Sequence, residues 1–286
     1  MKTCIITGAN SGIGKCATTQ IASKGYAVVL ACRNMAQAEA TREGIIRATG
    51  NPNVTAMQLD LSSIAEVRRF VDEFTGRFGA LDVLINNAAD FDLSRKAPKI
   101  TVEGFEAQFV TNYLAPFELV RGLLPLLQQS ADGRILNVSS QGLMLYPNLT
   151  FDFDNIQGQK GYSPAKTYYQ TKLALMMFSL ALRERLAGTA VSVYGVRVTN
   201  VKIDVSRYPN LSSLQKFLYR IKSRFSISPD EMAKVYTELA TGEKRQGLYY
   251  DEKLAEVPVN RSAHDKAAQE RLWALSEELL KKEGAT

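Results

Sequence analysis

The sequence has little of the chemistry on which metal sites, disulfide frameworks and histidine-centred catalysis depend. Its 286 residues include three cysteines, one tryptophan and one histidine. Three cysteines form an odd set without metal-ligand spacing, so we expect buried thiols in a reducing compartment rather than disulfides. The only histidine, His264, is expected at the surface, which argues against a metal site or a catalytic dyad built on histidine.

Long apolar runs and secretion signals are also missing. No run is long enough to span a bilayer, and the N-terminus enters the first predicted strand without a signal peptide. These features predict a cytoplasmic protein. No linker, repeat or low-complexity segment divides the chain, so we expect one domain over residues 1–286, with a core large enough to need neither disulfides nor metal.

The excess of basic charge is confined to one segment. The formal net charge is +6, and residues 197–224 hold seven basic side chains against one acidic side chain, a local excess of six. The rest of the chain is balanced and carries no nucleic-acid recognition motif, which argues against a nucleic-acid-binding protein. The basic residues are Arg197, Lys202, Arg207, Lys216, Arg220, Lys222 and Arg224, and the acidic residue is Asp204.

Strand-like runs alternate with helix-like runs along the whole chain. This alternation predicts an α/β fold of the Rossmann type, a doubly wound parallel sheet of about seven strands with helices on both faces. The expected strands are Lys2–Thr7, Tyr26–Cys32, Val54–Leu59, Leu81–Asn86, Arg134–Ser139, Ala190–Val196 and Leu248–Tyr250. The first expected helix ends near Lys24, and the others cover about 35–48, 63–77, 101–129, 164–187, 229–241 and 262–282.

A glycine-rich turn connects the first predicted strand with the first predicted helix. Its sequence, Gly8-Ala-Asn-Ser-Gly12-Ile-Gly14, has the spacing G-x-x-x-G-x-G. Glycines let the backbone approach a pyrophosphate closely, and the start of the helix offers N–H groups and a positive dipole end. A flexible loop is the alternative, but the strand and helix on either side favour a dinucleotide site. The candidate cofactor residues here are Gly8, Asn10, Ser11, Gly12, Ile13 and Gly14.

The end of the second strand indicates which dinucleotide is bound. Arg33 and Asn34 follow this strand, and no acidic residue occurs before Glu39. NAD-binding sites place a carboxylate there to accept from the ribose 2′-hydroxyl, whereas an arginine suits a 2′-phosphate. Arg33, with Lys15 as support, therefore favours NADP(H) over NAD(H); a solvated arginine is the alternative.

Tyr168 and Lys172 are four residues apart in a predicted helix, so they lie on one face of it. A lysine ammonium beside a phenol favours the phenolate and lowers the tyrosine pKa. Such a phenol can exchange a proton with a substrate oxygen near neutral pH. Because Tyr-x-x-x-Lys also occurs by chance on helix surfaces, its significance depends on the motifs around it.

The glycine loop and the Tyr168/Lys172 pair together resemble the short-chain dehydrogenase/reductase family, over nearly the whole chain. Asp60-Leu61 resembles the pair that contacts adenine, and Asn86-Asn87-Ala88-Ala89 resembles the family's Asn-Asn-Ala-Gly motif, with alanine in place of the glycine. The resemblance implies a cofactor site that also includes Asp60, Leu61, Asn87, Ala88, Tyr168 and Lys172.

The same resemblance implies the catalytic roles. Ser140, after the fifth strand, matches the serine that orients the substrate oxygen, and Tyr168 matches the general acid or base. Lys172 matches the lysine that lowers the tyrosine pKa and holds the nicotinamide ribose. Asn112 matches the helix asparagine that positions a water molecule of the proton relay.

One branch of the family is especially similar. The motifs Thr7–Lys15, Ala31–Met35 and Glu270–Trp273 resemble the retinol dehydrogenases and the short-chain domain of WW-domain oxidoreductase. That resemblance implies NADP(H)-dependent interconversion of a carbonyl and an alcohol on a lipophilic retinoid-, steroid- or polyketide-like molecule. Two other hypotheses stay open: a non-catalytic NADP-binding scaffold or sensor, and an epimerase or dehydratase that uses the same Tyr/Lys pair.

The stretch after the sixth strand departs from the family. Relatives carry Pro-Gly and then a serine or threonine that contacts the nicotinamide amide, whereas this chain has Val198-Thr199 and Ile203 at those places. Thr199 or Asn200 is the expected substitute for that contact. The region of about 199–228 matches the family's substrate-covering segment.

Two apolar patterns predict larger contacts. In residues 211–225, leucine, isoleucine and phenylalanine recur at steps of three and four beside basic residues, which predicts an amphipathic helix. It is either a lid over the active site or a peripheral contact with an anionic membrane surface. Leu173–Leu182 is apolar nearly all round, so its outer face predicts a homo-oligomer unless residues 151–162 or the C-terminal helix cover it.

Overall fold

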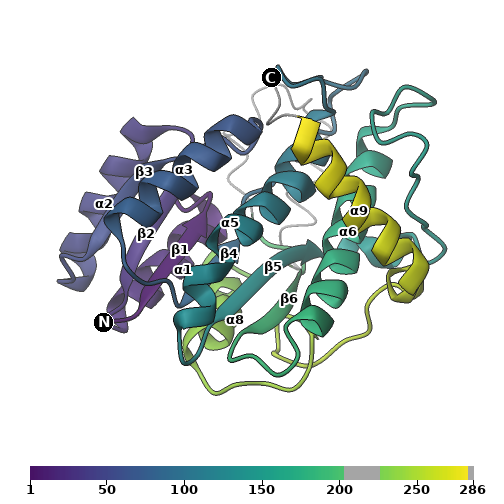
Figure 1. Ribbon diagram of the computed structural model, residues 1–286. Helices are drawn as coiled ribbons and strands as arrows, with labels where there is room; N and C mark the ends of the chain where they lie inside the picture. Colours follow the sequence, from purple (N-terminus) through teal and green to yellow (C-terminus); the bar gives the residue numbers. More distant parts are fainter. Residues whose placement is uncertain (203–225, 283–286) are drawn as a thin grey trace.

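A parallel sheet of seven strands forms the centre of the protein, in a computed structural model that describes residues 1–202 and 226–282 (Figure 1). Every pair of neighbouring strands is parallel. The order β3-β2-β1-β4-β5-β6-β7 runs outward in both directions from β1 and β4, and a doubly wound sheet opens its ligand crevice at that switch point. The predicted Rossmann-type sheet is therefore confirmed. The strands are β1 Thr3–Thr7, β2 Ala27–Cys32, β3 Val54–Gln58, β4 Val83–Asn86, β5 Arg134–Ser140, β6 Ser192–Val198 and β7 Tyr249–Tyr250.

Helices cover both faces of the sheet, as predicted. One core lies under α1, α2 and α8, and the other lies under α3, α5 and α6, with α9 outside α5 and α6 (Figure 1). The long helices are α1 Gly12–Ser23, α2 Met35–Thr49, α3 Ile64–Arg77, α5 Ala115–Gln129, α6 Pro164–Arg185, α8 Pro229–Thr241 and α9 Lys266–Lys282. The short ones are α4 Ala107–Phe109, the π-helical turn η1 Val110–Leu114, and the 3₁₀ turns η2 Gln141–Leu145 and η4 Arg261–His264.

Adjacent residues of the inner strands enter opposite cores, because side chains alternate along a strand. Ile5 and Leu84 belong to the core under α3, α5 and α6, whereas Ile6 and Ile85 belong to the core under α1 and α8. The inner strands are thus buried on both faces, which explains why their sequences are apolar without alternation.

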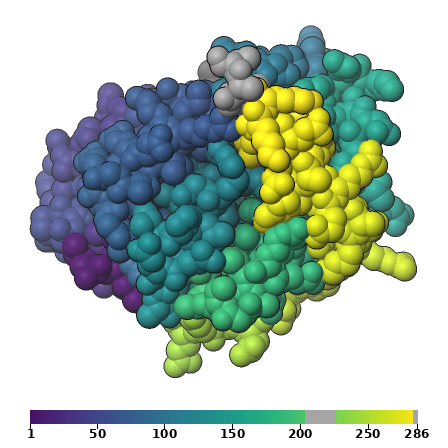
Figure 2. All heavy atoms as spheres, in the orientation of Figure 1, coloured from purple at the N-terminus to yellow at the C-terminus, as the bar shows by residue number. Residues whose placement is uncertain are grey.

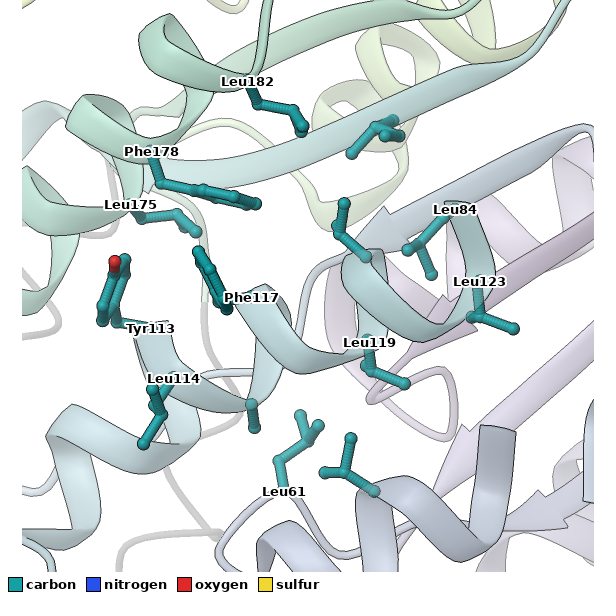
Figure 3. Close-up of a cluster of buried hydrophobic side chains, with 14 of the residues drawn as sticks. Leu61, Leu84, Tyr113, Leu114, Phe117, Leu119, Leu123, Leu175, Phe178 and Leu182 are labelled. Atoms are coloured by element: carbon teal, nitrogen blue, oxygen red, sulfur yellow. The ribbon is translucent and has the colours of Figure 1, made fainter. Parts of the chain in front are cut away.

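Aromatic side chains join α5 to α6 in the first core. The ring centroid of Phe117 on α5 lies 5.1 Å from that of Phe178 on α6 and 5.0 Å from that of Trp273 on α9. Figure 3 shows Phe117 and Phe178 close together, with Leu119 and Leu123 continuing along α5. This packing fixes the position of α6 relative to the sheet.

The apolar stretch of α6 is covered within the chain. Of Leu173–Leu182, every residue except the half-buried Leu180 is buried. Figure 2 shows α9 lying over this helix. The Trp273 ring of α9 lies 5.6 Å from the Phe178 ring, tilted against it, and the Arg185 guanidinium lies 4.0 Å from the Trp273 ring centroid. The C-terminal helix therefore covers the outer face that motivated the prediction of a homo-oligomer, and the oligomeric state itself stays a prediction.

The helix predicted over 101–129 begins later and changes form along its length. Gly104, at φ +80°, donates from its N–H to Thr101 O at 3.0 Å, so a turn replaces the first expected helical residues. Helical structure starts only after Glu106, whose side chain caps it by accepting from Phe109 N at 2.8 Å. The π-helical turn η1, which contains Asn112, then leads into α5.

The amphipathic helix predicted at 211–225 lies outside the described residues, as does Ile203. Two backbone hydrogen bonds connect the residues on either side of that region. Lys202 N donates to Ile227 O at 2.9 Å, and Ile227 N donates to Asn200 O at 3.0 Å. Ser228 then starts α8 with a capping box. Among the described helices, none is both long and apolar enough to cross a membrane.

Two of the three cysteines and the single histidine lie where the sequence predicts. Cys4 and Cys32 are buried, Cys16 is half-buried, and all three are free thiols. His264 is exposed, in the short helix that precedes α9. Within residues 1–202 and 226–282, no group of three His, Cys, Asp or Glu side chains is arranged as metal ligands.

Candidate active site

Four of the predicted site residues lie at the carboxyl ends of four neighbouring strands. Gly8 follows β1, Asn87 follows β4, Ser140 ends β5 and Thr199 follows β6. Because these strands are parallel and adjacent, the four residues share one edge of the sheet. β6 reaches Val198, two residues beyond its predicted end, since it pairs with β5 as far as Ser140.

The glycine loop has the shape that a pyrophosphate site requires. Gly8 and Gly12 have φ angles of +65° and +55°, which glycine adopts without strain. A Cβ on Gly14 would lie 2.6 Å from both Asn87 Nδ2 and Gly8 O, so only glycine fits there. Ser11 starts α1 without a side-chain cap hydrogen bond, which leaves the first N–H groups of the helix for an anion.

Thr7 and Asn87 brace this loop across the switch point. Thr7 Oγ1 accepts from the N–H groups of Asn87 and Ala88, both at 3.0 Å. Asn87 Nδ2 donates in return to Thr7 O at 2.8 Å. The turns after β1 and β4 are therefore bonded to each other. The part played by Thr7 was not predicted, although its position directly before Gly8 is a usable signal.

The adenosine end of the predicted site combines an exposed cation with two side chains that have structural partners. Arg33 is exposed, and in the described part of the chain its guanidinium makes no ion pair. Asn34 caps α2 by accepting from Gln37 N at 3.0 Å, and Asn10 Nδ2 donates to Gln37 Oε1 at 3.0 Å. Arg33 therefore remains available for a phosphate, while Asn34 serves as a helix cap. Exposed Lys15, in the first turn of α1, is a second cation near the loop.

Asp60 and Leu61, after β3, differ in what they offer a cofactor. Asp60 Oδ1 accepts from Ser62 N at 2.9 Å and from Ser62 Oγ at 2.7 Å, which shapes the turn. The Leu61 side chain is buried in the core, as Figure 3 shows, so its contribution to a cofactor site is limited to the main chain. Ile13 similarly packs, half-buried, against the other core.

Tyr168 and Lys172 lie together on α6, as their spacing predicts. They are 9% and 2% exposed, and Lys172 Nζ is 5.5 Å from the centroid of the Tyr168 ring. Lys172 Nζ also donates to Val138 O at 2.8 Å. Burial lowers the pKa of Lys172 to about 7. The amine therefore titrates near neutral pH, a property that the spacing alone did not reveal.

Ser140 lies where β5 passes into η2. Its Oγ accepts from Gly142 N at 3.1 Å, which leaves the hydroxyl hydrogen for a further acceptor. The backbone bond fixes the position of the hydroxyl at the sheet edge.

Asn112 ties three segments together. Its Oδ1 accepts from Asp90 N at 2.7 Å, and its Nδ2 donates to Asp90 O at 3.0 Å and to Thr171 Oγ1 at 3.2 Å. These bonds hold the loop after β4 against α6, next to the Tyr168/Lys172 pair. Within the described residues, no hydrogen bond links the Asn112 side chain to Lys172, so its part in a water-mediated relay stays a prediction.

The residues that replace Pro-Gly after β6 make a new contact. Thr199 Oγ1 donates to Gln141 Oε1 at 2.7 Å, so the predicted nicotinamide contact is engaged by the residue next to Ser140. Arg197, part of the basic segment, lies 3.3 Å from Asp251, and both side chains are less than one-fifth exposed. One cation of the local charge excess is therefore paired with a residue outside the segment.

Exposed apolar side chains are concentrated in the two loops beside this site. Apart from Met1, every exposed large apolar side chain of the described residues lies after β4 or after β5. The Phe91 ring lies 4.4 Å from the Tyr168 ring. Exposed apolar side chains grouped in this way are typical of a surface that contacts apolar molecules. The residues are Phe91, Leu93, Ile100, Val102, Met144 and Leu145.

Similar sequences extend over nearly the whole chain. The model of a family described as short chain dehydrogenase matches residues 2–151. Retinol dehydrogenase 13 of Mus musculus is 34% identical over 286 residues, which cover 98% of this chain and 84% of that protein. Retinol dehydrogenase 11 of Mus musculus is 35% identical over 283 residues, with 98% and 86% covered.

Solved structures share the fold. An uncharacterised protein from Mycobacterium Paratuberculosis has a TM-score of 0.74 at 29% identity, over 98% of this chain and 94% of that one. A short chain dehydrogenase from Shigella flexneri 2A, complexed with NADP, has a TM-score of 0.66 at 20% identity, over 88% and 97%; this second likeness shows the fold alone. Motifs, sheet topology and relatives agree that the chain belongs to the short-chain dehydrogenase/reductase family, in its retinol dehydrogenase-like branch.

Proposed function

We propose that this protein is an NADP(H)-dependent oxidoreductase that interconverts a carbonyl and an alcohol on a lipophilic small molecule. The observation that carries the proposal is the buried Lys172 amine beside the Tyr168 phenol, at the sheet edge that also bears Ser140 and the glycine loop. Its relatives support oxidoreductase chemistry on alcohols and carbonyls. The exposed Arg33 guanidinium, which makes no ion pair within the described residues, supports NADP(H), and the exposed apolar side chains after β4 and β5 support a lipophilic substrate.

The residues present fit a nicotinamide dinucleotide. Gly14 leaves the space that a Cβ would fill, and α1 begins beside it without a side-chain cap. The glycine loop would hold the pyrophosphate, Arg33 the 2′-phosphate and Lys172 the nicotinamide ribose. When bound, the dinucleotide supplies or accepts the hydride.

The chain's own residues orient the substrate and move the proton. Ser140 donates its hydroxyl hydrogen to the substrate oxygen and so positions the reacting carbon. Tyr168 gives its phenolic proton to that oxygen during reduction and takes a proton from it during oxidation. Lys172, when protonated, favours the phenolate and lowers the pKa of Tyr168. Asn112 positions a water molecule that connects Lys172 with solvent.

Oxidation of NADPH over a panel of lipophilic aldehydes, ketones and quinones tests the proposal. We expect net NADPH consumption with at least one class and a lower kcat/KM with NADH. Binding of NADPH without turnover on any substrate would support the scaffold hypothesis, which the Thr199–Gln141 bond favours because it engages the expected nicotinamide contact. Conversion of substrate without net NADPH consumption would indicate an epimerase or dehydratase.

Peripheral contact with an anionic membrane surface is a second part of the proposal. The alternation of apolar and basic residues in 211–225 supports it, and so do the exposed apolar side chains of the loop after β4. Co-sedimentation with phosphatidylserine-containing vesicles measures the contact. A variant that neutralises Lys216, Arg220 and Arg224 should partition less onto the vesicles, and unchanged partitioning would contradict this part of the proposal.

A further inference from the structure

Tyr236 is a buried tyrosine from a distant part of the sequence, and its hydroxyl lies at the sheet edge that bears the glycine loop and Asn87. It lies in α8, its side chain is 0% exposed, and its OH donates to Asn87 Oδ1 at 3.3 Å. Gln20 of α1 holds α8 in place, because its Nε2 donates to Asp230 Oδ1 at 2.9 Å and its Oε1 accepts from Thr237 Oγ1 at 2.9 Å. The phenol is thus presented to Asn87 by two helices that are bonded to each other.

The Asn87 amide is the surface against which the glycine loop packs. Its Nδ2 donates to Thr7 O at 2.8 Å and would lie 2.6 Å from a Cβ on Gly14 and 3.4 Å from a Cβ on Gly8. The amide is therefore close to both glycines at once. Any rotation or shift of this amide would move the backbone that faces a pyrophosphate.

The orientation of an amide side chain is decided by its hydrogen-bond partners, because one end donates and the other accepts. Asn87 directs its donor end to Thr7 O, so its acceptor end needs a donor, and the Tyr236 hydroxyl supplies one. The phenol stays protonated, since burial raises the pKa of Tyr236 and the nearby Tyr168 phenol adds to the rise. A rotated amide would set its oxygen against Thr7 O, which is unfavourable.

We propose that Tyr236 is a positioning residue for the pyrophosphate-binding loop: its hydroxyl keeps the Asn87 amide in the orientation that seats Gly8 and Gly14. This inference rests on the proposed cofactor and concerns a residue outside the motifs that indicate the site. Because the effect passes through the loop, it concerns ligands that carry a pyrophosphate. The affinity for ligands that occupy only the adenosine end should not depend on the Tyr236 hydroxyl.

Tyr236→Phe removes the hydroxyl and keeps the ring, so it tests the inference with little change in packing. Calorimetry would measure the Kd of NADPH and of adenosine 2′-monophosphate, which lacks both phosphates of the pyrophosphate. The loss of one hydrogen bond is expected to raise the Kd of NADPH about threefold to tenfold and to leave that of the monophosphate within about twofold. The kcat at saturating NADPH should stay near that of the wild type.

Tyr194→Phe is the matched control. Tyr194 is 1% exposed, and its hydroxyl accepts from Arg245 N at 3.1 Å, away from the glycine loop. This variant should leave both dissociation constants unchanged. In an Asn87→Ala background, Tyr236→Phe should have no further effect on NADPH, because the amide through which it acts is gone.

Three results would overturn the inference. They are an unchanged Kd for NADPH in Tyr236→Phe, equal weakening of NADPH and the monophosphate, and full additivity with Asn87→Ala. If the wild-type protein bound the monophosphate and NADPH no better than a control protein, the proposed function itself would fail instead.

Discussion

Lys172 Nζ donates to Val138 O at 2.8 Å while it stands 5.5 Å from the ring centroid of Tyr168. The amine is 2% exposed, so both neighbours lie inside the contact between α6 and the sheet. One turn of helix brings Lys172 and Tyr168 to the same face, and packing of that face removes the amine from water. Water exclusion is what lowers the pKa of Lys172.

Tyr168→Phe should fold and bind NADPH but lose turnover. The phenol is the proposed proton donor in reduction, and acid–base catalysis of this kind contributes about 10²- to 10⁴-fold. We expect kcat to fall by roughly that factor, with the melting temperature and the NADPH Kd close to those of the wild type. Tyr169→Phe is the control: Tyr169 is the adjacent tyrosine, and its ring contacts both the Tyr168 ring, at 5.2 Å, and the Tyr146 ring, at 4.8 Å, so the variant removes a neighbouring hydroxyl and keeps the ring packing. A near-normal kcat in Tyr168→Phe would remove this residue from the mechanism.

Lys172→Met should change how stability depends on pH in the cofactor-free protein. The pKa of Lys172 falls from 10.5 to about 7 on folding, so between these values the unfolded chain binds more protons than the folded chain. The free energy of unfolding of the wild type therefore rises with pH across this window, by at most about 1.4 kcal/mol per pH unit from this residue. Below pH 7 Lys172 is protonated in both the folded and the unfolded state. The free-energy cost of burying its charge then lowers the stability of the folded protein in full.

Urea unfolding at pH 6.5, 8.0 and 9.5 measures this difference. The difference in the free energy of unfolding between Lys172→Met and the wild type should favour the variant most at pH 6.5. This difference should shrink as the pH rises. Lys166→Met, at an exposed position earlier in the same helix, provides the control and should follow the wild-type profile. Parallel profiles for wild type and Lys172→Met would show that burial does not shift the titration of Lys172.

Arg33→Ala should reduce the preference for NADPH. The exposed Arg33 guanidinium is the expected partner of the 2′-phosphate, and a hydrogen bond to a charged group contributes about 1.5–3 kcal/mol, or roughly 10- to 100-fold. The ratio of kcat/KM for NADPH to that for NADH should fall by about this factor, mainly through KM. Arg47→Ala, which removes an exposed arginine paired with Glu43 on α2, should leave the ratio unchanged. A constant ratio in Arg33→Ala would assign the phosphate to another residue.

Gly14→Ala should abolish tight NADPH binding. The new Cβ would lie 2.6 Å from Asn87 Nδ2 and from Gly8 O, so the loop and the Asn87 turn must separate. Gly44→Ala is a matched substitution, since Gly44 is also helical and a Cβ there meets nothing within 4 Å. It should bind NADPH normally and gain up to about 1 kcal/mol of stability from helix propensity. Calorimetry and thermal melting of the two variants distinguish these outcomes, and normal binding by Gly14→Ala would contradict the close approach.

Much of the fold and site could be predicted because the informative residues are close together in the sequence. The glycine loop sits between one strand and one helix, and Tyr168 and Lys172 are separated by one helical turn. The turn at Gly104 is a local feature too. It was not predicted, because the helical pattern of the residues that follow it indicated a helix from residue 101 onward. The role of Thr7 could not be predicted, because it depends on hydrogen bonds to Asn87 and Ala88, which are 80 and 81 positions away in the chain.

By itself, the sequence determined the seven-stranded α/β architecture, the glycine loop and the Tyr168/Lys172 spacing, because periodicity and spacing are properties of neighbouring residues. Only the tertiary structure decided that α9 covers α6, that burial moves the pKa of Lys172 to about 7, and that Tyr236 holds Asn87 across 149 positions. Each of these depends on atoms from segments that are far apart in the chain. No local pattern encodes the distance between such atoms, because packing alone brings them together.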